Sequence, residues 1–266
     1  GASPFVPMHH AALDGRLRYR VRVRRGGVAA LGFQVLAGRG LAPRRIAAYV
    51  PDRELPVLPD GDFEIVLARQ EPPPYQCQAA IWVGIPDDAS ALVASQFVGD
   101  PVHEVPAQLA IEPLDRPAPP SPLHDHVLAQ RLDEVAWSVA RLVTLHRTIH
   151  PELLSAPNRL EPIPAAELGA GTGTSAADWC LTGSFRPARD GGWGTAPPPP
   201  VTRWWSVALE NVWHECCDAR SGTAAASNAT AVRRPDGSVR LVVAARDPGV
   251  PGIIWLDTGG RHRGFV

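Results

Sequence analysis

The segment Trp213–Asp218 reads WHECCD and contains His, Glu, Cys and Asp, the residue types that bind metals or carry nucleophilic and acid–base catalysis. It ends a run from Trp204 that contains neither Gly nor Pro, and we interpret this run as one long β-strand. Alternate side chains of a strand share a face, so His214, Cys216 and Asp218 would be neighbours at steps of about 6–7 Å. Zinc would need further ligands, and neither a CxxC nor an HExxH spacing supplies them. We therefore expect no metal, and elemental analysis would test this.

The opposite face of the same strand would be the buried one, because its positions are mostly apolar: Trp205, Val207, Leu209, Asn211, Trp213, Glu215 and Cys217. Glu215 would then enter an apolar environment, where an unpaired carboxylate costs several kcal/mol. Two interpretations stay open. Glu215 could form a structural brace with Arg203 or Arg246, or it could act as a general acid or base in a pocket.

Composition excludes several function classes. The chain has 266 residues, 45% of them hydrophobic, enough for one large or two modest domains. All 26 basic residues are Arg, which removes lysine-dependent catalysis. The net charge of -1 gives no reason to expect nucleic-acid binding, and no apolar run reaches the roughly 18 residues of a membrane span. Four Cys are too few for a disulfide scaffold, so we expect reduced thiols in a cytoplasmic protein.

Short β-strands dominate the first part of the chain. Residues 16–24 read RLRYRVRVR and alternate strictly, with an Arg face that either meets solvent or faces an anion or another domain. The turn Arg25-Gly26-Gly27 predicts a hairpin over residues 16–36. Further strands are expected at residues 62–68, 79–85, 91–98 and 108–114. Spacing this regular favours a sandwich or barrel.

A long amphipathic helix follows. Ser121 is a plausible N-cap, and the helix should end near His150-Pro151. Its apolar residues recur at three- and four-residue steps: Val127, Leu128, Leu132, Val135, Val139, Leu142 and Val143. We divide the chain into an N-terminal β region (1–118), the helix (119–151), a Pro/Gly-rich connection with a short strand (152–200) and a C-terminal β region (201–266).

The C-terminal region resembles the bacterial domain of unknown function 1214. The matching motifs are Arg203 with Trp205-Ser206, Asn211 with Trp213 and Glu215, Asn228, Pro235-Asp236-Gly237, Arg246–Pro251 and Trp255–Thr258. The chain departs from the family pattern at Gly252-Ile253-Ile254 and in the order Arg261-His262, and His214 and its two Cys neighbours are local novelties. The resemblance implies a mainly β fold, an antiparallel jelly-roll-like sandwich with a second β layer, and implies no reaction.

Polar groups that converge on an aromatic-lined concavity form the default ligand site. The candidate catalytic residues are Glu215, Asp257, Asp247 and His214; the candidate substrate-binding residues are Arg203, Arg246, Asn211, Asn228, Trp205, Trp213, Trp255 and His262. With no cofactor motif, we predict a cofactor-independent small-molecule enzyme of specialised metabolism, a lyase, isomerase or cyclase using acid–base carboxylates. The alternative is a non-catalytic module that binds a sugar or hydrophobic ligand or has a structural role. The expected partner is a small-molecule ligand, with neither nucleic acid nor membrane, and a homo-oligomer is compatible with the sequence.

Overall fold

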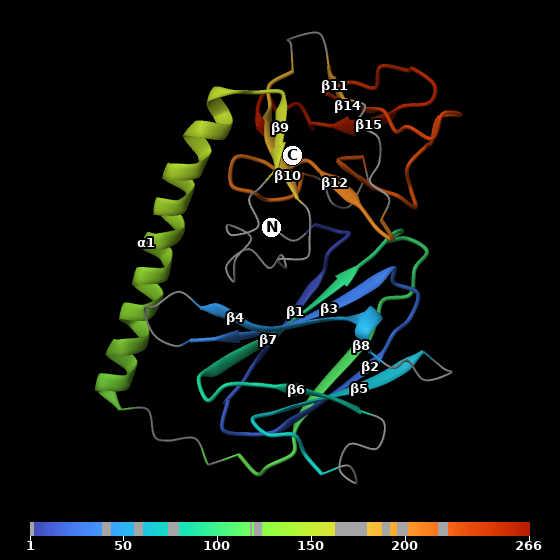
Figure 1. The fold of residues 1–266 in the computed structure, drawn as a ribbon. Helices are drawn as coiled ribbons and strands as arrows, with labels where there is room; N and C mark the ends of the chain where they lie inside the picture. The colour runs from blue at the N-terminus through green and yellow to red at the C-terminus, as the bar shows by residue number, and fades with distance from the viewer. Residues whose placement is uncertain are drawn as a thin grey trace.

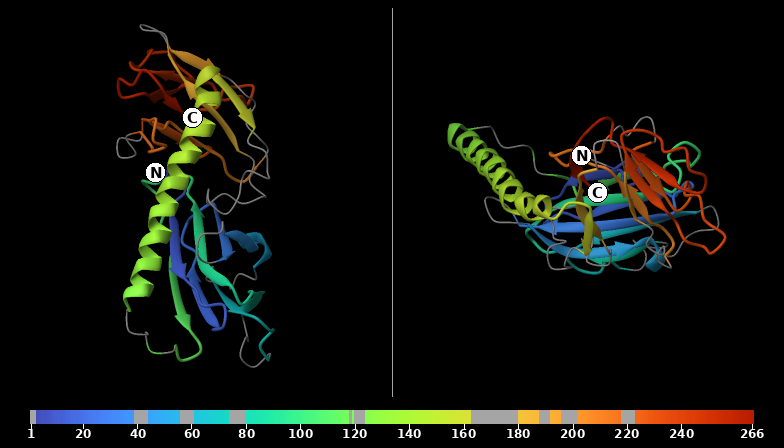
Figure 2. Two further views of the ribbon diagram at one scale, coloured as in Figure 1. Left: turned by 90° about the vertical axis from the view of Figure 1, so that its left-hand side faces the viewer. Right: turned by 90° about the horizontal axis from the view of Figure 1, so that it is seen from above.

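The protein is mainly β, with two larger sheets, three small ones and one α-helix among the residues described. The computed structural model describes residues 3–38, 44–55, 61–73, 80–117, 119, 124–162, 180–187, 192–195, 202–217 and 223–266. The N-terminal strands lie at one end of the molecule and the C-terminal strands at the other, with the helix alongside (Figures 1 and 2). The expected β-rich sandwich with one helix is confirmed.

Two four-stranded sheets form the N-terminal region. One has the order β1 (Met8–Ala12), β7 (Ala89–Phe97), β3 (Ala30–Ala37), β4 (Arg45–Pro51). The other has the order β6 (Ala80–Gly84), β5 (Asp62–Ala68), β2 (Tyr19–Arg24), β8 (Gln108–Pro113). The strands expected at residues 62–68, 79–85, 91–98 and 108–114 are therefore confirmed within a few residues. The β5–β6 pair is parallel, so the sandwich is mixed rather than wholly antiparallel.

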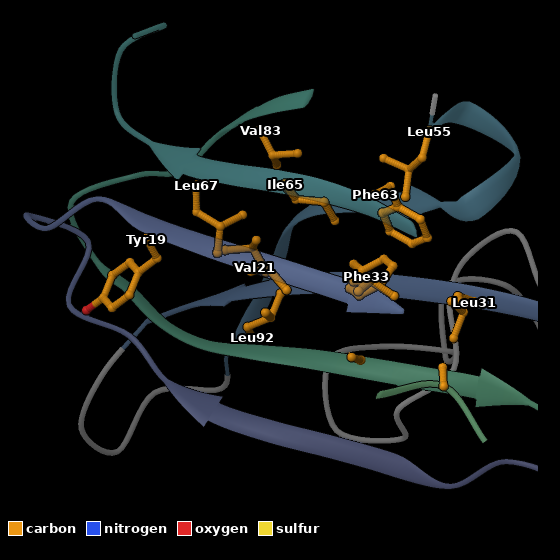
Figure 3. Close-up of a cluster of buried hydrophobic side chains, with 14 of the residues drawn as sticks. Tyr19, Val21, Leu31, Phe33, Leu55, Phe63, Ile65, Leu67, Val83 and Leu92 are labelled. Atoms are coloured by element: carbon orange, nitrogen blue, oxygen red, sulfur yellow. The ribbon is translucent and has the colours of Figure 1, made fainter. Parts of the chain in front are cut away.

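The core lies between these two sheets, where apolar side chains from both interdigitate (Figure 3). Val21 and Ile65 point inward from one sheet, and Phe33 and Leu92 from the other. The rings of Phe33 and Phe63 meet edge to face across the layers, with centroids 5.9 Å apart. The alternating sequence of β2 therefore buries one face of the strand as predicted, and Val21 and Val23 are each 2% exposed.

The hairpin expected over residues 16–36 is wrong, because β2 and β3 belong to different sheets. β3 is buried along almost its whole length and needs partners on both sides, which β4 and β7 supply. Around the Arg25-Gly26-Gly27 turn, Gly27 N–H donates to Val105 O at 2.9 Å and Ala29 N–H donates to Phe97 O at 2.9 Å. With these bonds the chain crosses from the sheet of β2 to the sheet of β3 instead of returning beside β2.

The Arg face of β2 is an outer face paired with its neighbours. Arg22 forms ion pairs with Glu64 at 3.1 Å on β5 and with Glu112 at 2.9 Å on β8. Arg20 also lies within 3.4 Å of Glu64. Cross-strand ion pairs of this kind hold neighbouring strands in register, so the Arg face of β2 stabilises the sheet.

The C-terminal region has a separate core and three small sheets. The first has the order β16 (Gly264–Phe265), β10 (Leu181–Phe185), β9 (Arg159–Pro162), and the second has the order β11 (Trp193–Thr195), β14 (Leu241–Ala244), β15 (Ile254–Asp257). The third pairs β12 (Ser206–Ala208) with β13 (Ala225–Ser227). The β14–β15 pair is parallel. Phe185, Leu209, Val243 and Leu256 are among the buried residues of this core.

The single α-helix of the described chain, α1 (Asp125–Ser155), runs along the side of the molecule (Figure 2). It ends four residues beyond the expected Pro151, and its N-cap position is His124. Ser121, the expected N-cap, lies outside the described residues. Near its C-terminal end the helix meets β10, where Ser184 Oγ donates to Leu153 O at 2.6 Å. No helix of the described chain combines the length and apolarity needed to cross a membrane.

Candidate functional site

The segment Trp204–Cys217 is a short strand followed by a tight reversal, so the prediction of one long strand is wrong. β12 ends at Ala208, and Glu210 then bridges antiparallel to Cys216. Asn211 N–H donates to Glu215 O at 2.8 Å, and His214 N–H donates to Asn211 O at 3.1 Å. The chain therefore turns over three residues, Val212–His214, and returns beside itself; Asp218 lies outside the described residues.

Asn211 is the physical reason for the reversal. Its Oδ1 accepts hydrogen bonds from the N–H groups of Trp213 at 2.8 Å and Glu215 at 3.0 Å, so its side chain stands in for a backbone partner. His214 closes the turn with φ of 56°, in the left-handed region, which His tolerates better than most residues. Turn chemistry outweighs the strand propensity of this segment.

The reversal puts Glu215 at the surface, which overturns the expected buried acid. Glu215 is exposed, and its Oε2 accepts from Asn211 Nδ2 at 2.6 Å. Trp213 is 69% exposed instead of forming a pocket wall. Leu209 and Cys217, also expected on the buried face, are buried. Glu215 therefore forms neither a buried ion pair with an Arg nor an acid inside a pocket.

His214 instead forms a pair with Glu210, which is not among the predicted site residues. Nδ1 of His214 lies 2.6 Å from Glu210 Oε2, and the imidazole stacks on Phe265 with centroids 4.4 Å apart. The two side chains are 33% and 28% exposed, so solvent reaches both. An imidazole held by a carboxylate can take up and release a proton.

Cys217 does not complete this pair as a nucleophile. Burial raises the pKa of its thiol; Arg261 opposes that shift, while the charges of Glu210 and Asp257 add to it. A thiol with a raised pKa stays protonated near neutral pH and is a poor nucleophile.

The other predicted residues near the C-terminus make local contacts. Asp247 Oδ1 accepts from Gly249 N–H at 2.8 Å and Asp257 Oδ1 from Gly259 N–H at 2.7 Å, so both carboxylates hold turns. Trp255 Nε1 donates to Ala244 O at 3.0 Å. Arg246 and His262 are exposed.

An open groove of about 300 Å³ lies where the C-terminal region meets the N-terminal sandwich. Its walls come from β3, the end of β4, the following turn of 3-10 helix η1 (Asp52–Glu54), the end of β7 and the chain just before β12. The groove is lined by Ala30, Leu31, Tyr49, Pro51, Asp52, Arg53, Phe97, Thr202, Arg203 and Trp204. Of the predicted site residues, Arg203 alone is in this lining.

Arg203 is anchored by the buried carboxylate of Asp52. Its Nη1 lies 3.4 Å from Asp52 Oδ1, and its Nη2 donates to Ala29 O at 2.7 Å. Arg25 binds the other oxygen, Oδ2, of the same carboxylate. Asp52 is 4% exposed, and a charge buried to that degree needs such partners. Arg203 therefore pairs with an acid of the N-terminal region, and the Glu215–Arg203 brace that the sequence left open is not formed.

Asn228 holds the backbone that carries Arg203, which gives a structural role to two more predicted residues. Its Oδ1 accepts from Trp205 N–H at 3.3 Å, and its Nδ2 donates to Arg203 O at 3.3 Å. Nearby, Ser227 Oγ donates to Gly99 O, which ties β13 to the loop after β7. These bonds fix the segment 203–205 against the N-terminal sandwich.

Aromatic side chains form the apolar wall of the groove. Trp204 Nε1 donates to Val98 O at 2.8 Å, and its ring meets Phe97 edge to face at 4.9 Å. Tyr49 lies over Gly32: a Cβ added there would come within 2.8 Å of the Tyr49 hydroxyl, so the phenol ring would have to move. The hydrogen bond to Val98 O holds the Trp204 indole in place.

The charge of the groove lining is positive. Asp52 is committed to Arg25 and Arg203, whereas the Arg53 side chain is 64% exposed and its nearest carboxylate, Glu54, lies 3.9 Å away. Arg203 is 55% exposed and keeps N–H donors beyond those given to Asp52 and Ala29. Guanidinium groups beside aromatic rings suit a ligand that is anionic at one end and apolar at the other.

A metal site is not evident in the described chain: no group of three or more His, Cys, Asp or Glu side chains is placed to hold an ion.

Comparison with known proteins identifies relatives without naming an activity. Residues 193–266 match the family model described as "Protein of unknown function (DUF1214)". An uncharacterised protein from Burkholderia cenocepacia has a crystal structure that superposes with a TM-score of 0.85 and 30% sequence identity, covering 99% of this chain and 72% of that one. The VPA0106 protein from Vibrio parahaemolyticus gives a TM-score of 0.49 at 12% identity, covering 98% and 82% of the two chains. None of the curated proteins compared with the chain matches it.

Proposed function

The chain belongs to the DUF1214 family, whose description states no activity, and we propose from the groove geometry that it binds a small anionic molecule with an apolar ring. This proposal rests on the anchoring of Arg203 by the buried carboxylate of Asp52 in the groove wall. Asp52 is the one acidic residue among the described residues that line the groove. A carboxylate or phosphate group would accept hydrogen bonds from Arg203 and Arg53. The ring would lie against Trp204 and Phe97.

The open form of the groove supports binding over catalysis. An enzyme usually encloses its reacting atoms and excludes water, whereas this depression is open on one side. Its one acid, Asp52, is held between two guanidinium groups, and this arrangement favours an anchoring role. We therefore favour the ligand-binding alternative and propose that the ligand binds at Arg203 instead of at Glu215.

Affinity for charge-matched probes tests the proposal. We expect isothermal titration calorimetry to detect binding of benzoate or phenyl phosphate, and weaker binding of benzyl alcohol, benzylammonium and glucose, because the latter three lack the anion. Comparison of benzoate with phenyl phosphate distinguishes the two anion types. Arg53→Gln should weaken binding of the anion by about tenfold, about 1.4 kcal/mol.

Arg45→Gln is the matched control, because Arg45 is similarly exposed but pairs with Asp88 at 2.9 Å at the other end of β4. It should leave the affinity unchanged. Equal affinity for benzoate and benzyl alcohol, or an Arg53→Gln variant that binds like the wild type, would refute an anion site in the groove.

The Glu210–His214 pair supports a second candidate, the cofactor-independent acid–base enzyme expected from the sequence. Its separation of 2.6 Å and partial exposure suit proton transfer to a small molecule. In this case His214 keeps its proposed catalytic role and Glu210 takes the place of Glu215. NMR spectra of the same probe mixtures would reveal it as new resonances that His214→Gln abolishes.

A further inference from the structure

The two β regions have separate hydrophobic cores and are connected through helix α1. Every described strand before α1 belongs to the N-terminal sheets, and every described strand after α1 belongs to the C-terminal sheets (Figure 1). Regions connected in this way move relative to each other unless the interface between them is large and apolar. The contacts between the two regions therefore decide how firmly they stay together.

The contacts in the wall of the groove are mainly polar. The guanidinium group of Arg203 lies 3.4 Å from Asp52 Oδ1 and donates to Ala29 O at 2.7 Å. The indole N–H of Trp204 donates to Val98 O at 2.8 Å. A hydrogen bond of this kind adds little net stability, because the same groups bind water when the two regions separate. These bonds alone hold the regions together weakly.

Another contact between the regions lies outside the groove. Ser227 Oγ donates to Gly99 O, and a Cβ placed on Gly99 would lie 3.1 Å from the Cβ of Ala229. These three residues are not in the groove lining. We use the term junction for these contacts together with those of Arg203 and Trp204. The junction thus has one part that a ligand in the groove would touch and one part that it would not.

A ligand in the groove would contact both regions at once. Arg53 and Phe97 in the lining belong to the N-terminal region, whereas Arg203 and Trp204 belong to the C-terminal region. The two bonds of the Arg203 guanidinium group within the junction leave it further N–H donors, so an anion can bind without displacing either partner. The ligand would therefore add contacts across the junction and remove none.

A ligand that needs both regions binds only while they are docked, and by linkage it stabilises the docked arrangement. We propose that the two β regions dock and separate reversibly at the junction, and that an anion bound in the groove locks them in the docked arrangement. This inference rests on the proposed function for the nature of the ligand. It adds that binding at the groove controls the relative position of the two regions.

Hydrogen–deuterium exchange of the full chain tests the lock at amides that the ligand does not touch. Gly99 and Ser227 are buried at the junction, so their N–H groups become open to water when the regions separate. We expect benzoate to slow the exchange of both amides at least about threefold, and benzyl alcohol to have less effect. The Gly237 amide is the internal control: it donates to Arg234 O in an exposed turn, and its exchange should not change.

A reversible crosslink across the junction gives a second readout. Gly99→Cys/Ala229→Cys places two Cβ atoms 3.1 Å apart, slightly closer than the range of about 3.5–4.5 Å in disulfides. Glu104 Oε1, at 2.5 Å from the added Cβ, is the end of a flexible side chain and can move. The oxidised form should bind benzoate at least about threefold more tightly than the reduced form, and a threefold gain means that about one third of the free molecules are docked.

The wild type carried through the same oxidation and reduction is the control for the crosslink, and its affinity should stay the same. Absence of benzoate binding to the wild type would remove both this inference and the proposed function. Binding that leaves the exchange of Gly99 and Ser227 unchanged, or equal affinity of the oxidised and reduced forms, would overturn the lock and leave the proposed function standing.

Discussion

At the scale of single residues, the Asp52 carboxylate connects the two β regions. It holds Arg25, which follows β2, and Arg203, which precedes β12 and lies 151 residues beyond Asp52 in the sequence. The sequence singles out Arg203, in the RWWS motif, as a candidate substrate-binding residue. It does not single out Asp52, because no local pattern links the stretch YVPDRE to that motif and only the tertiary fold brings them together.

Asp52→Asn should lower the free energy of unfolding by about 1–3 kcal/mol. The amide keeps the shape but removes the negative charge that two guanidinium groups share, and breaking a largely buried pair costs more than breaking a surface one. Urea denaturation followed by tryptophan fluorescence measures this change.

Asp14→Asn is the control for Asp52→Asn, since Asp14 pairs with Arg16 at 2.7 Å on the surface. It should cost less than about 1 kcal/mol. Equal losses in the two variants would show that Asp52 is not the structural anchor described above.

Glu215 shows why a residue's environment can be misread from alternation. The period-two pattern correctly buried Leu209 and Cys217, but it assumed an uninterrupted strand between them. The Asn211 side chain and the left-handed His214 reverse the chain in that interval. Asn211, two residues before Trp213, does carry a turn signal, the capacity of its side chain to accept hydrogen bonds from backbone N–H groups, and weighing that signal would have moved Glu215 to the surface.

At the scale of elements, strand positions were more predictable than strand partners. β2 follows from strictly alternating apolar residues, and β5, β7 and β8 follow from short apolar runs, although β7 is buried along almost its whole length. Pairing depends on contacts distant in sequence, which is why the 16–36 hairpin failed: β2 pairs with β5 and β8 instead. Helix α1 was predictable from its period, whereas its exposure was not, since periodicity identifies an apolar face but not what covers it.

Gly264→Ala should destabilise the C-terminal sheet. A Cβ at Gly264 in β16 would lie 2.2 Å from Glu210 O and 2.7 Å from the Phe185 ring, and neither the backbone nor a fully buried ring can move away cheaply. Overpacking of this kind typically costs about 1–3 kcal/mol. Thermal unfolding measured by calorimetry would show the loss.

Gly194→Ala is the matched substitution in β11, where the nearest atom, Leu241 O, is at an ordinary contact distance of 3.5 Å. Its melting temperature should change much less. If both variants melt together with the wild type, the close packing of β16 against Glu210 is incorrect, and with it the frame that holds the Glu210–His214 pair.

At the scale of the whole molecule, two β regions with separate cores meet at the groove, and α1 runs beside both (Figure 1). The mainly β sandwich was predictable because its short strands and turns recur regularly. The division at residues 118, 151 and 200 stays a prediction. The groove was not predictable, since its lining combines residues from β3, β4, β7 and the segment before β12, and no sequence motif spans them.

The most direct test of the groove as a ligand site is a crystal structure of the full chain with 4-bromobenzoate, whose bromine can be located by anomalous scattering. We predict a bromine peak beside Trp204 and Phe97, with the carboxylate within hydrogen-bonding distance of Arg203 or Arg53. A bromine peak beside the Glu210–His214 pair, or an empty groove at a saturating concentration of the compound, would contradict the proposed function.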